Sequence, residues 1–112
     1  MSMPFVWFHN GSGEPAASAG FYEKLLGWKA SDGPPGMTML AAGEGPFAAV
    51  MPAKAAVDGW VPYVEVADVA DATRRAAKLG ASVIEDRTRG PAGTYSVLRD
   101  PGGALFALWQ KA

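Results

Sequence analysis

Two titratable side chains lie inside apolar stretches of this sequence. His9 is the only histidine, and it follows the four apolar residues FVWF at 5–8. An imidazole there could coordinate a metal, act as an acid or base, donate a hydrogen bond to a ligand, or have no chemical role. Glu65 lies within the apolar stretch WVPYVEV at 60–66, where its carboxylate must face solvent or have a partner, because an unpaired buried charge is costly. His9 and Glu65 are therefore candidates for an acid–base pair.

Several other chemistries lack the groups that they need. The chain has no cysteine, which excludes disulfides, thiolate nucleophiles and cysteine-bound zinc. The segment GSGEPA at 11–16 has the letters of a dinucleotide fingerprint. However, Glu14 would repel the pyrophosphate, and Pro15 removes an N–H donor from the same turn. No serine has the G-x-S-x-G spacing of a serine hydrolase.

The positions of these residues follow from an order of elements that occurs twice. The first strand at 5–9 is followed by a helix from Pro15 to Leu26, which Gly27 ends, and the second strand at 60–66 is followed by a helix at 69–79, which Asp68 caps and Gly80 ends. Three short strand candidates follow each helix: 28–30, 37–40 and 47–51 in the first half, and 82–87, 94–100 and 104–110 in the second. Turn clusters separate them, such as SDGPPG and DPGG. The sequence thus predicts strand–helix–three strands, repeated, with AKAAVDG at 53–59 as the linker.

Bulk composition limits the protein to one small globular domain. Its 112 residues are 49% hydrophobic, with a net charge of −1 and no basic block. We therefore expect no nucleic-acid partner and no membrane partner. No apolar run is long enough to span a bilayer and no signal peptide is recognisable, so we expect a cytoplasmic location. Apolar surface and sheet edges favour a homodimer.

Three segments resemble the vicinal oxygen chelate superfamily, which includes glyoxalase I, bleomycin-resistance proteins and extradiol dioxygenases. They are AGFYEKLLGW after the first strand, VPYVEVADVADATRRAAKLGA in the second half, and RDPGGALFALWQ at the end. The ending is similar to that of a glyoxalase-like subgroup. The resemblance implies an α+β fold in which two βαβββ modules form a cupped eight-stranded mixed sheet with the helices outside. It also implies a single glyoxalase-like domain over 1–112, with modules at about 4–52 and 60–110.

The resemblance implies four metal-ligand positions, and here all four are apolar. Enzymes of the family place His, Gln or Glu on the first, fourth, fifth and eighth strands. In this sequence the corresponding positions hold Trp7, a residue of the apolar stretch FAAVM (whose only donor is the thioether of Met51), Val61 and Ala107. Divalent ions need several imidazole, carboxylate or carbonyl ligands at one point. We therefore expect no metal and no other cofactor.

Strand alternation places an aromatic set on the face where the family binds its ligands. His9 shares a face with Trp7, as Glu65 does with Tyr63, and Trp109 with Ala107. The predicted ligand-binding residues, which line a cleft, are Trp7, His9, Met51, Tyr63, Glu65 and Trp109. Aromatic walls with a few polar groups are typical of small-molecule sites, whereas the same aromatic residues could equally form core or dimer packing.

Three functions remain open. The first is a metal-free protein of the glyoxalase and bleomycin-resistance type that binds a small molecule. The second is a lyase, isomerase or dioxygenase of the same fold, either metal-dependent or using His9 and Glu65 as acid and base. The third is a structural or regulatory module whose cleft is filled by its own side chains.

Overall fold

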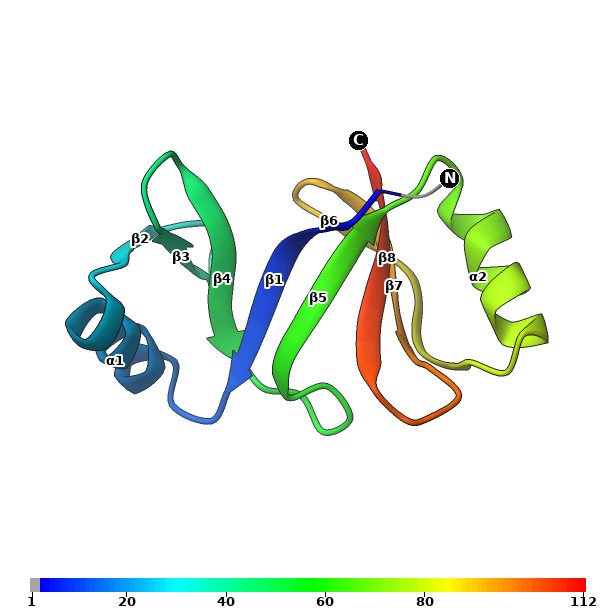
Figure 1. Ribbon diagram of the computed structural model, residues 1–112, viewed down its shortest axis with the longest axis horizontal. Coiled ribbons are helices and arrows are strands. Elements are labelled where there is room, and N and C mark those ends of the chain that lie inside the picture. Colours follow the sequence, from blue (N-terminus) through cyan, green and yellow to red (C-terminus); the bar gives the residue numbers. More distant parts are fainter. Residues whose placement is uncertain (1–2) are drawn as a thin grey trace. The chain divides into compact units, whose positions relative to one another are not determined.

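The computed structural model describes residues 3–112, which form two helices and eight strands. In chain order these are β1 (Phe5–Ser12), α1 (Pro15–Leu26), β2 (Lys29–Asp32), β3 (Thr38–Ala41), β4 (Pro46–Pro52), β5 (Gly59–Glu65), α2 (Val69–Lys78), β6 (Ser82–Gly90), β7 (Gly93–Arg99) and β8 (Leu105–Lys111). The order is βαβββ twice (Figure 1). The strands form an open mixed sheet in the order β2-β3-β4-β1-β5-β8-β7-β6. The predicted α+β class and the eight-stranded mixed sheet are confirmed.

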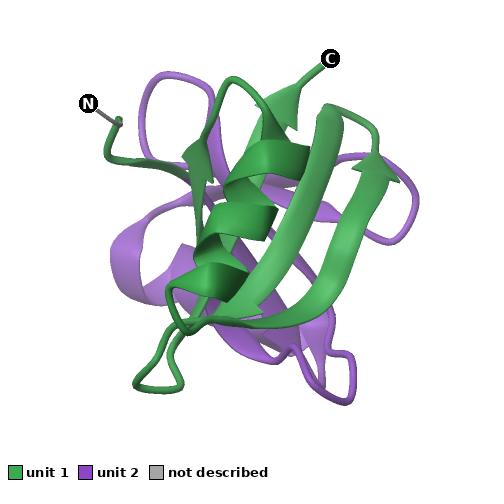
Figure 2. Cartoon of the chain, turned by 90° about the vertical axis from the view of Figure 1, so that its right-hand side faces the viewer, with its two compact units in different colours: residues 1–6, 62–112 green, residues 7–61 purple. Residues whose placement is uncertain are grey.

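Each module has one parallel strand pair among antiparallel ones. β1 runs parallel to β4, and β5 runs parallel to β8. The neighbouring pairs β2/β3, β3/β4, β6/β7 and β7/β8 are antiparallel. The chain divides into two compact units, one of residues Trp7–Val61 and one of Pro62–Ala112 together with the segment up to Val6 (Figure 2). We call these the first unit and the second unit. The boundaries fall inside β1 and β5, so each of these strands contributes residues to both units.

The first unit has a small aliphatic core beneath α1, with mainly aromatic side chains packed against it. Ala19 of this helix packs with Leu40, Ala48 and Val50. The partly buried side chains against this cluster are Phe8, Tyr22, Trp28, Ala30 and Phe47. A bulge in β4, where Leu40 pairs with Ala48 and Ala41 pairs with Pro46, leaves Phe47 as the extra residue. Its ring lies 4.8 Å from that of Trp28, so the bulge adds an aromatic side chain to the α1 side of the sheet.

The helix α1 buries only some of its apolar side chains. Tyr22 packs inward, but Phe21, Leu25 and Leu26 are 51–63% exposed. The helix contacts its sheet through Ala19 and Tyr22, and these apolar neighbours lie outside that narrow contact. The predicted end is confirmed, because Gly27 has φ 74° and its N–H donates to the Glu23 carbonyl.

The second unit has an aliphatic core beneath α2. Val69 and Ala72 of this helix pack with Leu98 and Leu108, and Figure 2 shows α2 lying across the strands of its own unit. The predicted N-cap is confirmed, because Asp68 Oδ1 accepts a hydrogen bond from the Asp71 amide at 3.0 Å.

Several strands are longer than the sequence indicated. β1 continues to Ser12, past the predicted end at His9, because Gly11 and Ser12 pair with Met51 and Pro52 of β4. Gly11 also lies against the linker, where an added Cβ would come 3.1 Å from the Val57 carbonyl oxygen. β6 continues to Gly90 through two irregularities in its pairing with β7.

Candidate functional site

In the first unit, Trp7 and His9 lie on the face of the sheet opposite α1. Phe8 belongs to the core beneath α1, and Ser12 Oγ lies 2.6 Å from Ser18 Oγ of that helix. Phe8 and Ser12 therefore point toward α1, and alternation directs Trp7 and His9 to the other face. We call this the helix-opposed face of the first unit. The sequence predicted that Trp7 and His9 share one face of the strand, and in the structure they do.

Three of the candidate side chains of the first unit share this face. The rings of Trp7 and His9 meet edge to face, with centroids 6.2 Å apart and an interplanar angle of 78°. His9 pairs with Ala49 of β4, and Gly11 pairs with Met51, which places Met51 next to His9 along the strands. The side chain of Ala49 is a methyl group, so the β4 residue beside the imidazole offers no ligating side-chain atom.

In the second unit, Tyr63, Glu65 and Trp109 lie on the face opposite α2. Val64 and Leu108 pack beneath α2, and they alternate with these residues along β5 and β8. Tyr63 pairs with Ala107 and Glu65 pairs with Trp109, so each pair shares one face. This is the helix-opposed face of the second unit. Trp109 Nε1 also donates to the Ala92 carbonyl at 3.3 Å.

Glu65 has the ionic partner that its position required. Its Oε2 lies 3.7 Å from Nζ of Lys111, and its side chain is 34% exposed. An ion pair this open to solvent contributes little stability, but it satisfies the carboxylate. His9 belongs to the first unit and Glu65 to the second, so the acid–base pair stays a prediction.

The structure adds two residues to the helix-opposed face of the second unit. Tyr95 pairs with Trp109, and its ring lies 5.9 Å from that of Tyr63. Glu85 pairs with Val97, which is the neighbour of Ala107 in β7. Alternation within the stretch TYSVL could have identified Tyr95. Glu85 could not be identified in this way, because a bulge in β6 decides which face it is on.

The hydroxyl of Tyr63 has a raised pKa in the folded protein. Burial raises the pKa of its hydroxyl well above the ordinary value of 10.0, and the nearby Tyr95 and Glu85 raise it further. The side chain is only 5% exposed. The phenol is therefore neutral at physiological pH and can donate a hydrogen bond.

The side chains that the resemblance assigns to the family's metal positions do not fit a divalent ion. Trp7, Val61 and Ala107 carry no metal-ligating atom, and Val61 and Ala107 are at most 1% exposed. Among residues 3–112, no three His, Cys, Asp or Glu side chains are grouped closely enough to hold a metal. We therefore assign no chemical step to a metal.

The repeated βαβββ order is the fold that the resemblance implied. A glyoxalase-like domain model matches residues 8–109. The chain belongs to this family, which confirms the resemblance to the vicinal oxygen chelate superfamily. A search of curated proteins finds no match.

Solved structures share the fold at low sequence identity. Methylmalonyl-CoA epimerase (S115T) from Streptomyces coelicolor, in complex with 2-nitronate-propionyl-CoA, is 18% identical with a TM-score of 0.68, covering 100% of this chain and 96% of its own. A structure described as an NAD-dependent benzaldehyde dehydrogenase from Legionella pneumophila is 19% identical with a TM-score of 0.69, covering 95% and 98%. The hypothetical protein BH1468 from Bacillus halodurans is 14% identical with a TM-score of 0.68, covering 97% and 94%. These likenesses show the fold alone.

No helix within the described part of the chain is long and apolar enough to cross a membrane.

Proposed function

We propose that this protein binds a planar small molecule and does so without a metal ion. One observation carries the proposal: aromatic and hydrogen-bonding side chains occupy the helix-opposed faces, and apolar residues occupy the family's metal positions. Trp7 and His9 supply a ring and an imidazole in the first unit, and Tyr63, Glu65 and Trp109 lie on the corresponding face of the second. The fold is compatible with small-molecule binding, because methylmalonyl-CoA epimerase of the same fold was solved in complex with 2-nitronate-propionyl-CoA.

In this function Trp7 contributes a flat apolar surface and His9 a directional contact. Aromatic pairs are worth about 0.5–1.5 kcal/mol beyond the area that they bury. A neutral hydrogen bond contributes about 1 kcal/mol. Trp7 should therefore contribute more to affinity than His9.

Calorimetric titration with naphthylmethanol, a neutral planar compound, tests this function. We expect saturable binding to the wild type. The affinity should fall about tenfold or more in Trp7→Ala and about fivefold in His9→Gln. Trp60→Phe is the matched control. Trp60 Nε1 donates to the Tyr22 hydroxyl, and Tyr22 packs against the core beneath α1, so we expect the affinity of this variant to stay unchanged. Equal losses in the Trp7 and Trp60 variants would contradict the assignment.

Elemental analysis of the purified protein tests the metal-free part of the proposal. We expect less than a tenth of an equivalent of zinc, nickel, iron or manganese per chain, because the donor set is missing. About one equivalent of metal that is lost in His9→Ala would instead support a metal-dependent lyase, isomerase or dioxygenase.

We also propose that the protein works as a homodimer in the cytoplasm. The exposed apolar side chains of α1, Phe21, Leu25 and Leu26, support pairing, since exposed apolar patches tend to mark interaction surfaces. Light scattering should give twice the chain mass of 11.7 kDa. A monomer mass at micromolar concentration would contradict this.

A further inference from the structure

A tyrosine and a glutamate lie in one cross-strand row on the helix-opposed face of the second unit. Tyr63 of β5 pairs with Ala107 of β8, Ala107 pairs with Val97 of β7, and Val97 pairs with Glu85 of β6. Paired residues share a face, so all four side chains lie on the same side of the sheet. The residue beside Tyr63 in this row has only a methyl group, and it stands where the family places its last metal ligand.

The next row contributes aromatic rings. Tyr95 pairs with Trp109, and Trp109 pairs with Glu65. The rings of Tyr63 and Tyr95 are 5.9 Å apart and tilted by 51°. Glu85 lies in the same cross-strand row as Tyr63, and its carboxylate raises the pKa of the Tyr63 phenol. This face therefore combines π faces with negative charge.

A bulge in β6 puts Glu85 on this face. Ser82 and Val83 pair with Arg99 and Leu98, and if this register continued Glu85 would lie opposite Ser96. Ser96 is buried and hydrogen-bonded to Thr73 of α2, so that register would turn the carboxylate toward the helix. The irregularity between Val83 and Glu85 shifts the pairing to Val97, and the side chain changes sides.

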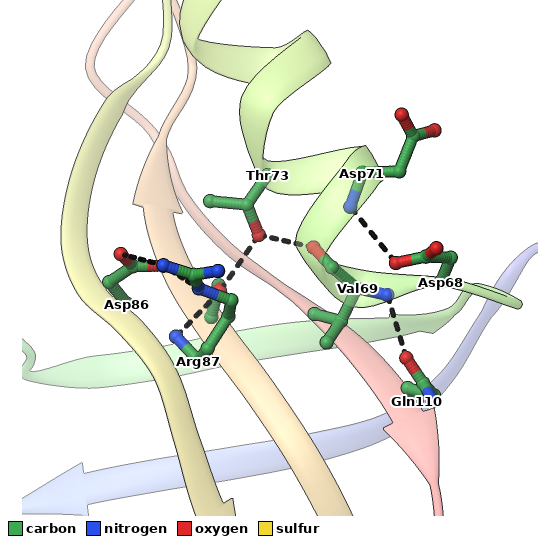
Figure 3. Close-up of polar contacts among 8 residues, drawn as sticks. Asp68, Val69, Asp71, Thr73, Asp86, Arg87 and Gln110 are labelled. Carbon is green, nitrogen blue, oxygen red and sulfur yellow. Dashed lines mark hydrogen bonds and ion pairs between the residues drawn. The ribbon is translucent and has the colours of Figure 1, made fainter.

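A second irregularity, between Glu85 and Thr88, is held by a buried hydroxyl. Arg87 has φ 47°, and its amide donates to Ser96 Oγ at 2.9 Å. Thr73 Oγ1 lies 2.9 Å from the same oxygen and donates to the Val69 carbonyl at 2.6 Å (Figure 3). The strained backbone after Glu85 is thus tied to the first turn of α2.

We infer that Tyr63, Tyr95 and Glu85 form a binding site for the protonated amino group of a planar aromatic ligand. A carboxylate accepts a charge-assisted hydrogen bond from an ammonium, and aromatic faces attract a cation through their quadrupoles. This inference rests on the proposed small-molecule function and names the ligand class for it.

The test compares three compounds with the same ring system. Naphthylmethylamine is a cation at neutral pH, naphthylmethanol is neutral and naphthylacetate is an anion. Calorimetric titration of the wild type should show the amine binding about tenfold more tightly than the alcohol, and the acetate binding least. In Glu85→Gln, which keeps the size of the side chain, the preference for the amine over the alcohol should fall to about twofold or less.

Asp86→Asn is the control for a general loss of negative charge. Asp86 is the next residue in β6, but its carboxylate is exposed and paired with the Arg87 guanidinium. This variant should keep the tenfold preference. Tyr95→Leu, which removes a ring and leaves the charge, should reduce the preference by a smaller factor than Glu85→Gln.

The outcomes separate this inference from the proposed function. Equal affinity of the amine and the alcohol, or an unchanged preference in Glu85→Gln, overturns the amine site and leaves small-molecule binding intact. Absence of binding for all three compounds overturns both. Circular dichroism of Glu85→Gln should match the wild type, and if it does not, the same preference measured in Glu85→Asp decides the question. Retention of about tenfold in that variant supports the site, and its loss overturns it.

Discussion

The helices α1 and α2 hold the same place in the two modules but are fixed by different means. α2 begins with the side-chain cap of Asp68, and the Val69 amide donates to Oε1 of Gln110 in β8. α1 begins with Pro15, and Glu14 before it forms no side-chain cap. A proline at the first position needs no cap for its missing N–H. The two modules therefore reach one topology through different local chemistry.

The two cores differ in the same way. Beneath α1 the partly buried packing is aromatic, with Tyr22 stacked on Trp28 at 5.4 Å. Beneath α2 the packing is mainly aliphatic, and the polar groups of Thr73 and Ser96 are buried within it. Buried hydroxyls are tolerated only when they are hydrogen-bonded, and these two hold a bulge in place. The comparison shows that buried polar groups in the second module fix the backbone after Glu85, whereas the packing beneath α1 is mainly aromatic.

The largest expected effect comes from separating the modules. A chain cut within 53–59 should give two fragments that do not unfold cooperatively alone, because β1 and β5 each supply residues to both units and a half-sheet of this size is marginal. Circular dichroism during urea titration measures this. Mixing the fragments should restore the transition. Cooperative unfolding of either fragment alone would contradict the prediction.

Removal of the buried Ser96 hydroxyl should lower the free energy of unfolding by about 2 kcal/mol. Ser96→Ala leaves the Arg87 amide without its acceptor, and an unsatisfied buried donor costs about 1–3 kcal/mol. Urea denaturation measures the loss. Ser31→Ala, at an exposed position in β2 of the first unit, should change stability by less than about 0.5 kcal/mol. Equal effects of the two substitutions would show that Ser96 has no special role.

High pH should destabilise the protein through Tyr63. Its pKa is raised in the folded state, so the unfolded chain releases this proton first, at its ordinary value of 10.0. The contribution of neutral Tyr63 to the free energy of unfolding is complete below pH 10. It is lost as the pH rises above 10, and at pH about 11 the loss is about 1.4 kcal/mol. Denaturation of the wild type and Tyr63→Phe across this range measures the difference. An identical pH dependence in both proteins would contradict the prediction.

The smallest expected effect is the loss of the N-cap of α2, compared with the matched change at the start of α1. Asp68→Ala should lower the unfolding free energy by about 1 kcal/mol, because it removes the acceptor of the Asp71 amide. Glu14→Ala is the matched change at α1 and should have an effect within about 0.5 kcal/mol. Thermal denaturation of the two variants measures the contrast. A larger loss at Glu14 would reverse the comparison.

The sequence by itself determined the elements and their order. Apolar alternation and glycine or proline punctuation act over a few residues, so all eight strands and both helices could be predicted, as could the caps Gly27 and Asp68. The same alternation set the face of Trp7 and His9, because a strand directs neighbouring side chains to opposite sides. The resemblance supplied the family, and the family-model match confirmed it.

Tertiary structure alone decided the features that depend on pairing between distant strands. The continuation of β1 to Ser12 follows from its pairing with β4, and the exposure of Phe21 and Leu25 follows from how narrowly α1 contacts its sheet. The face of Glu85 depends on the bulge between Val83 and Glu85, which exists only in the pairing of β6 with β7, a strand that follows later in the chain. No local pattern in SVIEDR shows this, because a one-residue shift in register moves every following side chain to the opposite face.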